Sequence, residues 1–175
     1  MDRDRHCRTC MGTQVDCPGH FGHIKLEKPV YHGNLLDYIR KVLKAVCWSC
    51  SHLLGDREDR KEELESYIHI KNSKSRFNKV QKLSSDIRDC SNCQVKNRKY
   101  SRGNLKIEYE VMDPTDHRPN NDTHQILWPE AAKAIFQKIT PKHLEMLGLS
   151  KTLSDPANMI IENLTVVPPP VRPSV

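Results

Sequence analysis

The chain has 175 residues, enough for one domain or two small ones. Hydrophobic residues make up 37% of the sequence and charged residues 29%, so the apolar area per residue is below that of a typical globular domain. Something besides an apolar core must therefore help to stabilise the fold. No stretch approaches the roughly 18 uninterrupted apolar residues that span a bilayer, and the N-terminal run MDRDRHCRTC has no apolar signal segment. These features argue against a membrane span and against secretion.

The net charge of +6 is concentrated in one segment. Residues 71–106 carry 11 Lys and Arg against 2 Asp and Glu, whereas residues 1–70 carry 11 against 11 and residues 107–175 carry 6 against 9. The segment therefore has a net charge of +9, and it also contains Cys90 and Cys93. Such a run is typical either of a surface that contacts phosphates or of a solvated face.

Residues 1–33 are predicted to form a first zinc-binding loop, because they show no helical or strand period and contain four metal ligands. The ligands are Cys7, Cys10, Cys17 and His20, in the spacing C-x2-C-x6-C-x2-H. Structural Zn²⁺ prefers such tetrahedral sulfur and nitrogen ligands. A redox role for the first cysteine pair would need a strand before it and a helix after it, which the sequence does not indicate.

Residues 34–103 are predicted to form a helical region. Apolar residues recur at helical spacing over 34–46, with Asn34 as the expected N-cap. Two further helices are expected over 56–70 and, with a weaker apolar stripe on a basic background, over 73–89.

Residues 104–175 are predicted to contain strands and helices that end in a Pro-rich segment. Strict alternation over 104–112 predicts a half-buried strand, and the polar run 113–124 predicts a loop. Pro129 opens a predicted helix to about residue 138, and Thr140 caps another that stops at Gly148. Residues 159–167 are predicted to form a strand before three consecutive prolines. The expected fold class is α+β, with small zinc-stabilised lobes, helices and short antiparallel strands.

The pairs Cys47 with Cys50 and Cys90 with Cys93 are predicted to share a second zinc ion, held by four thiolates. The ligand order C-C-C-H-C-C-C-C is also that of a RING-type ubiquitin ligase, whose two sites are interleaved. In a RING module the fourth and fifth ligands are a few residues apart, but 26 residues separate His20 from Cys47 here. Consecutive pairing, with two Zn²⁺ ions, is therefore preferred.

The other histidines are expected to be structural or exposed. His6, which adjoins Cys7, is the expected substitute ligand. Hydrogen-bonded structural roles are expected for three residues near the metal sites, His23, His32 and His52. Four scattered residues are expected to face solvent: His69, His117, His124 and His143.

The run CRTCMGTQVDCPGHFGHIKLEKPVYH resembles the zinc-binding clamp segment of the largest subunit of multisubunit DNA-dependent RNA polymerases. Its core CPGHFGHI, followed by KPV, an aromatic residue and His, is highly specific for that family. The final run MIIENLTVVPPPVRPSV is similar to another stretch of the family, and its Pro-rich form most resembles the eukaryotic RNA polymerase II members. The resemblance covers nearly the whole chain and is strongest at both ends.

This resemblance implies a function as the clamp, the mobile jaw that closes over DNA and the RNA–DNA hybrid, in a nuclear assembly with other polymerase subunits. The full enzyme would be a nucleotidyltransferase, but the family's Mg²⁺-binding catalytic motif lies downstream of this segment, which is therefore expected to be non-catalytic by itself. The candidate phosphate contacts are Lys96, Arg98, Lys99 and Arg102, and by resemblance alone Arg172.

Two other classes fit parts of the sequence: a free-standing zinc protein that binds nucleic acid, and a RING-like ligase. A free-standing factor should end on a capped element, which VPPPVRPSV does not provide. We therefore expect the chain to belong to a longer one.

Overall fold

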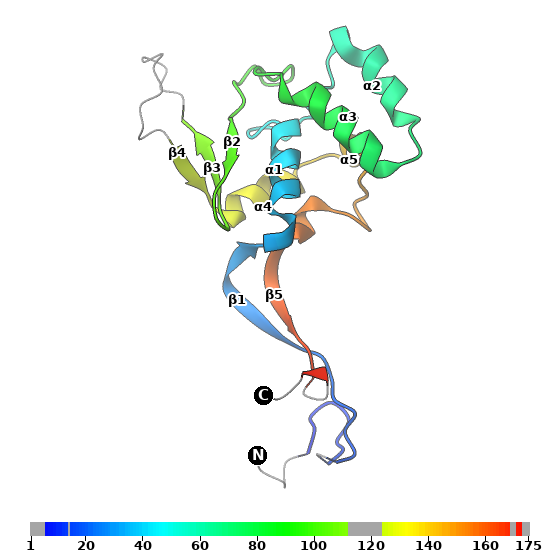
Figure 1. Ribbon diagram of the computed structural model, residues 1–175, viewed down its shortest axis with the longest axis vertical. Coiled ribbons are helices and arrows are strands. Elements are labelled where there is room, and N and C mark those ends of the chain that lie inside the picture. Colours follow the sequence, from blue (N-terminus) through cyan, green and yellow to red (C-terminus); the bar gives the residue numbers. More distant parts are fainter. Residues whose placement is uncertain (1–5, 14, 112–123, 169–170, 173–175) are drawn as a thin grey trace. The chain divides into compact units, whose positions relative to one another are not determined.

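The computed structural model describes residues 6–13, 15–111, 124–168 and 171–172 (Figure 1). The chain divides into two compact units: a smaller unit, Met1–Lys28 with Glu162–Val175, and a larger unit, Pro29–Ile161. Strands β1 (Gly22–Tyr31) and β5 (Ile160–Val166) pair with each other. Helices and short antiparallel strands occur together, which confirms the α+β class. The three-part division at residues 33 and 103 stays a prediction.

The first helix of the larger unit is α1 (Leu36–Ala45), which confirms the predicted helix over 34–46. The expected N-cap was wrong: Asn34 lies in a 3₁₀ turn, η1 (Gly33–Leu35), and Leu35 occupies the cap position without a side-chain hydrogen bond. Asn34 belongs to this turn because a hydrogen bond closes the turn around it: the N–H of Leu35 donates to the carbonyl of His32 at 2.9 Å.

The next two helices are shorter than predicted. A 3₁₀ turn, η2 (Glu58–Arg60), precedes α2 (Lys61–Ile68), and α3 (Ser73–Ser85) begins where the Asn72 side chain accepts a hydrogen bond from the N–H of Ser75. The predicted helix over 73–89 ends early because residues beyond Asp86 turn toward Cys90.

A three-stranded antiparallel sheet follows, in the order β2 (Tyr100–Arg102), β3 (Ile107–Glu110) and β4 (His124–Leu127). The predicted strand over 104–112 is therefore too long at its start. Leu105 is 75% exposed with φ 55°, in the turn that joins β2 to β3, where the N–H of Gly103 donates to the carbonyl of Lys106. Most of the predicted loop over 113–124 lies outside the described residues, and its last residue, His124, begins β4.

Helices α4 (Pro129–Gln137) and α5 (Pro141–Met146) confirm the two predicted helices. The Thr140 hydroxyl accepts a hydrogen bond from the N–H of His143, and Gly148 adopts φ 73°, as the predicted cap and stop require. A 3₁₀ turn, η3 (Pro156–Met159), leads into β5, which confirms the predicted strand. Strand β1 contradicts the predicted loop over residues 1–33; it forms because it pairs with β5, a partner from the other end of the chain.

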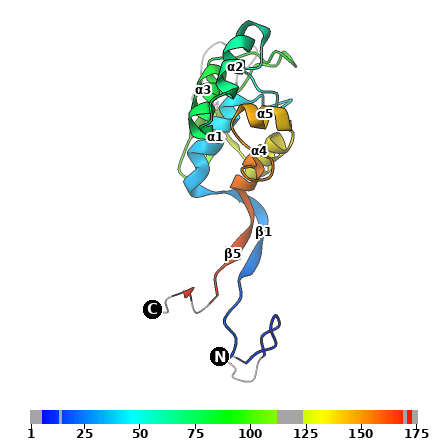
Figure 2. The ribbon, with the colours of Figure 1, turned by 90° about the vertical axis from the view of Figure 1, so that its right-hand side faces the viewer.

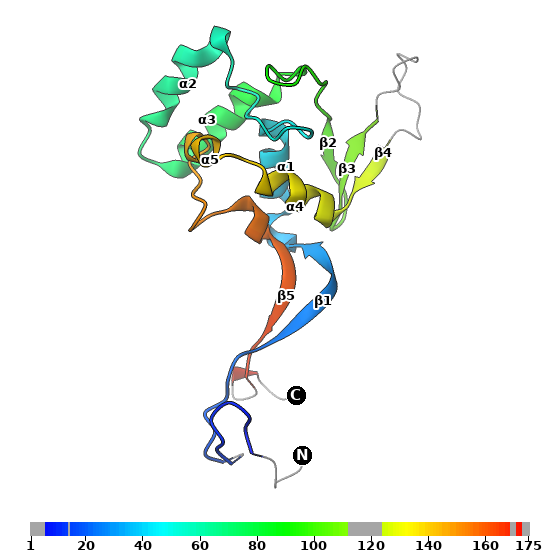
Figure 3. The same cartoon turned by 180° about the vertical axis from the view of Figure 1, so that it is seen from behind.

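The core of the larger unit centres on α1, which lies beside α3 (Figure 2) and also packs against β2 and η3. The rings of Tyr38 and Phe77 stack at 4.4 Å between α1 and α3. From α4 and α5, the fully buried side chains of Phe136, Leu144 and Leu147 join the same core. Helix α5 lies beside α2 and α3 (Figure 3). Helix α1 ends two residues before Cys47, and α3 ends five residues before Cys90.

The smaller unit has almost no apolar core. None of its described residues belongs to the buried apolar clusters, and Val15 and Phe21 are 93% and 69% exposed. The smaller unit therefore lacks the burial of apolar side chains that stabilises the larger unit. Within the described ranges, no helix has the length and apolar character needed to cross a bilayer.

Candidate metal centres

The first candidate centre lies in the smaller unit and is formed by Cys7, Cys10, Cys17 and His20. Their ligand atoms all lie within 4.8 Å of one another. The Nε2 atom of His20 is buried and has no hydrogen-bond partner among the described residues. A buried imidazole nitrogen without a partner is costly unless something occupies its lone pair, so the geometry fits a metal ion at this position.

The second candidate centre lies in the larger unit and brings together Cys47, Cys50, Cys90 and Cys93. The sulfurs of Cys47 and Cys93 are 3.5 Å apart and those of Cys50 and Cys90 are 3.6 Å apart, and all four cysteines are free. A disulfide would require about 2.05 Å, whereas two thiolates on one tetrahedral zinc lie about 3.8 Å apart. The separations therefore exclude a disulfide and are close to those of two ligands on a shared ion.

The second centre has its own apolar surroundings. Cys47 and Cys90 are fully buried and pack with Leu54 and Ile87 in a cluster separate from the main core. The residues between the two cysteine pairs form α2 and α3, so the 39-residue segment leaves the site and returns to it.

The same backbone turn occurs at all three C-x2-C pairs. The N–H of the first cysteine donates to the carbonyl five residues later: Cys7 to Gly12 at 2.9 Å, Cys47 to His52 at 2.9 Å and Cys90 to Val95 at 3.1 Å. The residue after the second cysteine then adopts positive φ, 57° at Met11, 60° at Ser51 and 59° at Gln94. Because none of the three is glycine, this conformation could not be predicted from the residue types.

We expect Gln94→Val to destabilise the larger unit by about 1–2 kcal/mol, because a β-branched side chain is strained at positive φ. Gln94→Gly should cause no such loss, since glycine adopts this conformation freely. Both substitutions remove the same exposed hydrogen bond from the Gln94 side chain to the Ser91 carbonyl, so they form a matched pair. Denaturant unfolding in excess zinc measures the difference; equal stability of the two variants would contradict the expected strain.

Each centre contains one thiol that loses its proton easily. The backbone N–H groups of Cys10 and Thr9 lower the pKa of the Cys7 thiol to about 6. Burial opposes ionisation of Cys50, but hydrogen bonds from the Asn92 side chain and the His52 backbone lower its pKa to about 7. Burial raises the pKa of Cys47 to about 12. An ion binding at the second centre must therefore displace the proton of Cys47, so its affinity falls as the pH falls.

The grouping of the ligands distinguishes the two arrangements that the sequence allowed, consecutive pairing and the interleaved pairing of a RING module. Consecutive pairs share a centre, Cys7 and Cys10 with Cys17 and His20, and Cys47 and Cys50 with Cys90 and Cys93. In a RING module the first pair would instead lie with the third. The structure therefore has the consecutive arrangement and lacks the interleaved one.

The four basic candidates near Cys93 have different surroundings. The Arg98 guanidinium lies between the rings of Trp48 and Tyr109, 3.8 and 4.2 Å from their centroids. Lys99 pairs with Glu110 at 3.3 Å, and Arg102 pairs with Asp37. Lys96 is exposed and makes no ion pair with another described residue, and Arg172 is also exposed. Three of the four cations thus already have partners within the chain.

A further cluster of His52, Asp56 and His143 was not predicted. His143 was expected to face solvent, but it is only 5% exposed, because the capped helix α5 directs it into the larger unit. Burial and the neighbouring His52 lower the pKa of His143, although Asp56 opposes this shift. The i, i+4 spacing of His52 and Asp56 was the only sequence signal, and nothing in it pointed to a partner 87 residues away.

Comparison with known proteins identifies the family. The family described as RNA polymerase Rpb1, domain 1 matches residues 1–175. DNA-directed RNA polymerase II subunit RPB1 of Euplotoides octocarinatus is 36% identical over 187 residues, which cover 100% of this chain and 38% of that protein. Subunit Rpo1N of Methanocaldococcus jannaschii is 33% identical, and subunit 1 of Acanthamoeba polyphaga mimivirus is 31% identical; each alignment covers 97% of this chain and 12% of the relative.

The chain thus spans well under half the length of these relatives. The match over the whole chain agrees with the resemblance noted at both ends of the sequence. This chain belongs to the family of the first domain of Rpb1, an N-terminal segment of the largest subunit of DNA-directed RNA polymerases.

Proposed function

We propose that this domain is the clamp segment of a DNA-directed RNA polymerase, in which it helps to hold DNA and the RNA–DNA hybrid beside the other subunits. The observation that carries the proposal is the family match over residues 1–175. Nucleotidyl transfer belongs to the whole enzyme in this proposal. A nuclear location is part of the proposal, and its support is the similarity to the RNA polymerase II subunit of Euplotoides octocarinatus.

Two zinc ions are part of this proposal. Cys7, Cys10, Cys17 and His20 would hold one ion, and the four cysteines of the second group would hold the other. The ions would supply structural cross-links and no reaction chemistry, since four protein ligands close each site. The interpretation as a free-standing zinc protein loses support, because every relative compared is a polymerase subunit.

The basic segment 71–106 supports contact with nucleic acid. Its exposed cations that make no ion pair with a described residue are Lys71, Lys74, Lys79, Lys82, Arg88 and Lys96. Lys96 lies in the turn anchored by Cys90 and Cys93, and its carbonyl accepts a hydrogen bond from the Trp48 ring N–H at 3.0 Å. The second cysteine centre thereby fixes the backbone that carries the Lys96 side chain. Contacts of this kind grip phosphates without reading the base sequence.

We expect the chain to bind duplex DNA weakly and without sequence preference. If about four to six phosphates are neutralised, log affinity should fall against log salt with a slope of roughly −3.5 to −5.5. Replacing four basic residues with glutamine should flatten that slope by up to about 3.6. The four are Lys96, Arg98, Lys99 and Arg102. Fluorescence anisotropy across a salt series measures both slopes.

The control removes the same number of charges from exposed lysines of the larger unit that lie outside the basic segment: Lys61, Lys138, Lys142 and Lys151. It should leave the slope nearly unchanged, and both variants should keep the metal content of the parent chain. An equal change of slope in the two variants, or none in the first, would show that residues 96–102 are a solvated or protein-docking face.

A further inference from the structure

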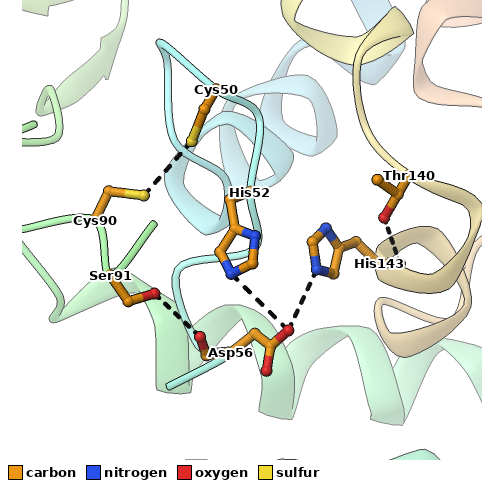
Figure 4. A network of polar contacts seen from close by, with 7 residues as sticks. All are labelled: Cys50, His52, Asp56, Cys90, Ser91, Thr140 and His143. Carbon is orange, nitrogen blue, oxygen red and sulfur yellow. Dashed lines mark hydrogen bonds and ion pairs between the residues drawn. The ribbon is translucent and has the colours of Figure 1, made fainter. Parts of the chain in front are cut away.

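We propose that His52, Asp56 and His143 form a third metal site, which takes a divalent transition-metal ion of the zinc type. The site lies in the larger unit and uses none of the cysteines. Figure 4 shows the two imidazole rings converging on the Asp56 carboxylate. Their ligand atoms all lie within 4.8 Å of one another.

The distances are close to those of a coordination sphere. Asp56 Oδ2 lies 3.3 Å from His143 Nε2 and 3.9 Å from His52 Nε2. Two nitrogen or oxygen ligands on one tetrahedral zinc, with bonds of about 2.0–2.1 Å, lie about 3.3 Å apart. The Asp56 and His143 pair already has this separation. His52, whose side chain is 24% exposed, has room to approach.

Interactions outside the cluster hold each ligand. The carbonyl of His52 accepts a hydrogen bond from the N–H of Cys47, and the carbonyl of Asp56 accepts one from the Ser91 hydroxyl at 3.1 Å. His143 lies in the first turn of α5, whose N-terminus is capped by Thr140 (Figure 4). Three separate parts of the unit thus bring the ligands together. The ligand side chains therefore lose little further conformational freedom when an ion binds.

The ligand set indicates which ions fit. Two imidazoles and one carboxylate suit Zn²⁺, Co²⁺ or Ni²⁺ and lack the thiolates that favour softer ions. Three protein ligands leave a fourth position open for water or an outside ligand. Without an ion, the carboxylate can accept hydrogen bonds from both rings, and this hydrogen-bonded trio is the alternative that the experiment must exclude.

The third ion should bind more weakly than the other two. A metal-bound histidine normally donates its second ring N–H to a partner, and losing such a partner costs about 10–100-fold in affinity. The Nδ1 atom of His143 is buried and has no partner in the described part of the chain. The third ion is therefore expected to be the first one lost on dialysis against a chelator.

Cobalt substitution of the full 175-residue chain tests the site. The cysteine centres give thiolate-to-cobalt charge-transfer absorption, whereas a site of two imidazoles and a carboxylate gives ligand-field bands alone. We expect a third equivalent of Co²⁺ to bind after the charge-transfer absorption has saturated. Metal analysis after equilibrium dialysis should then find three ions per chain.

Two variants assign the third ion. His143→Gln and His52→Gln should each lower the content from three ions to two, with charge-transfer absorption unchanged; His52→Gln guards against misfolding caused by a change at the more buried His143. His69→Gln, at the exposed end of α2, should keep three ions. A parent chain that saturates at two ions, or a third ion that survives both variants, would overturn the proposal.

Discussion

Cys17→Ser is expected to unfold the smaller unit while the larger unit stays folded. No described residue of the smaller unit belongs to a buried apolar cluster, so its order depends on the first metal centre. For small zinc modules the metal contributes on the order of 10 kcal/mol, and most of that is folding free energy. Zinc content should fall by one ion per chain. Hydrogen exchange should become fast over residues 6–28 and stay slow over α1.

Val15→Ser is the matched control for this prediction. Val15 lies in the same loop, two residues before Cys17, and is 93% exposed, so its replacement removes neither a ligand nor a packed side chain. Its metal content and exchange pattern should match those of the parent chain. If Cys17→Ser also made exchange fast in α1, the stability of the larger unit would depend on the first metal centre, and the prediction would be contradicted.

The sequence predicted the elements whose signals are local. Helix α5 is an example, because Thr140, Pro141 and Gly148 each favour one backbone conformation at one end of the helix. The sequence also predicted which cysteines and which histidine lie together in the two candidate centres, since cysteine spacing carries most of the information about a zinc site. Their consecutive grouping followed from the long separation between His20 and Cys47.

The strands and contacts that the sequence did not predict depend on partners that lie elsewhere in the chain. Strand β1 pairs with β5, more than 120 residues away, and its exposed side chains give no alternation of buried and exposed positions. The three-residue strand β2 is too short for a period, and it exists because β3 pairs with it. His143 was assigned to solvent for the same reason, since its partners His52 and Asp56 lie 91 and 87 residues earlier in the chain.

Phe136→Ala is expected to destabilise the larger unit by about 3–5 kcal/mol, because the side chain is fully buried in the core and its loss leaves a cavity. The neighbouring Ile135 carbonyl accepts a hydrogen bond from the Ser51 hydroxyl at 2.7 Å, so α4 is also attached to the turn that carries Cys47 and Cys50. Denaturant unfolding monitored by far-UV circular dichroism measures the loss, which should appear as a lower midpoint with little change in slope.

Phe21→Ala provides the control, since that phenylalanine is 69% exposed in the smaller unit and its removal should change stability by less than about 0.5 kcal/mol. The first metal centre should stay intact in the Phe136 variant, because none of its four ligands comes from the larger unit. Ions lost from Phe136→Ala under partly denaturing conditions should therefore come from the larger unit, from its cysteine group and from the proposed site of His52, Asp56 and His143. Cobalt spectra of Cys17→Ser with and without Phe136→Ala isolate the loss from the cysteine group, because only that group then gives charge-transfer absorption. Loss of the first centre in the Phe136 variant would instead mean that burial in the larger unit stabilises both metal centres together.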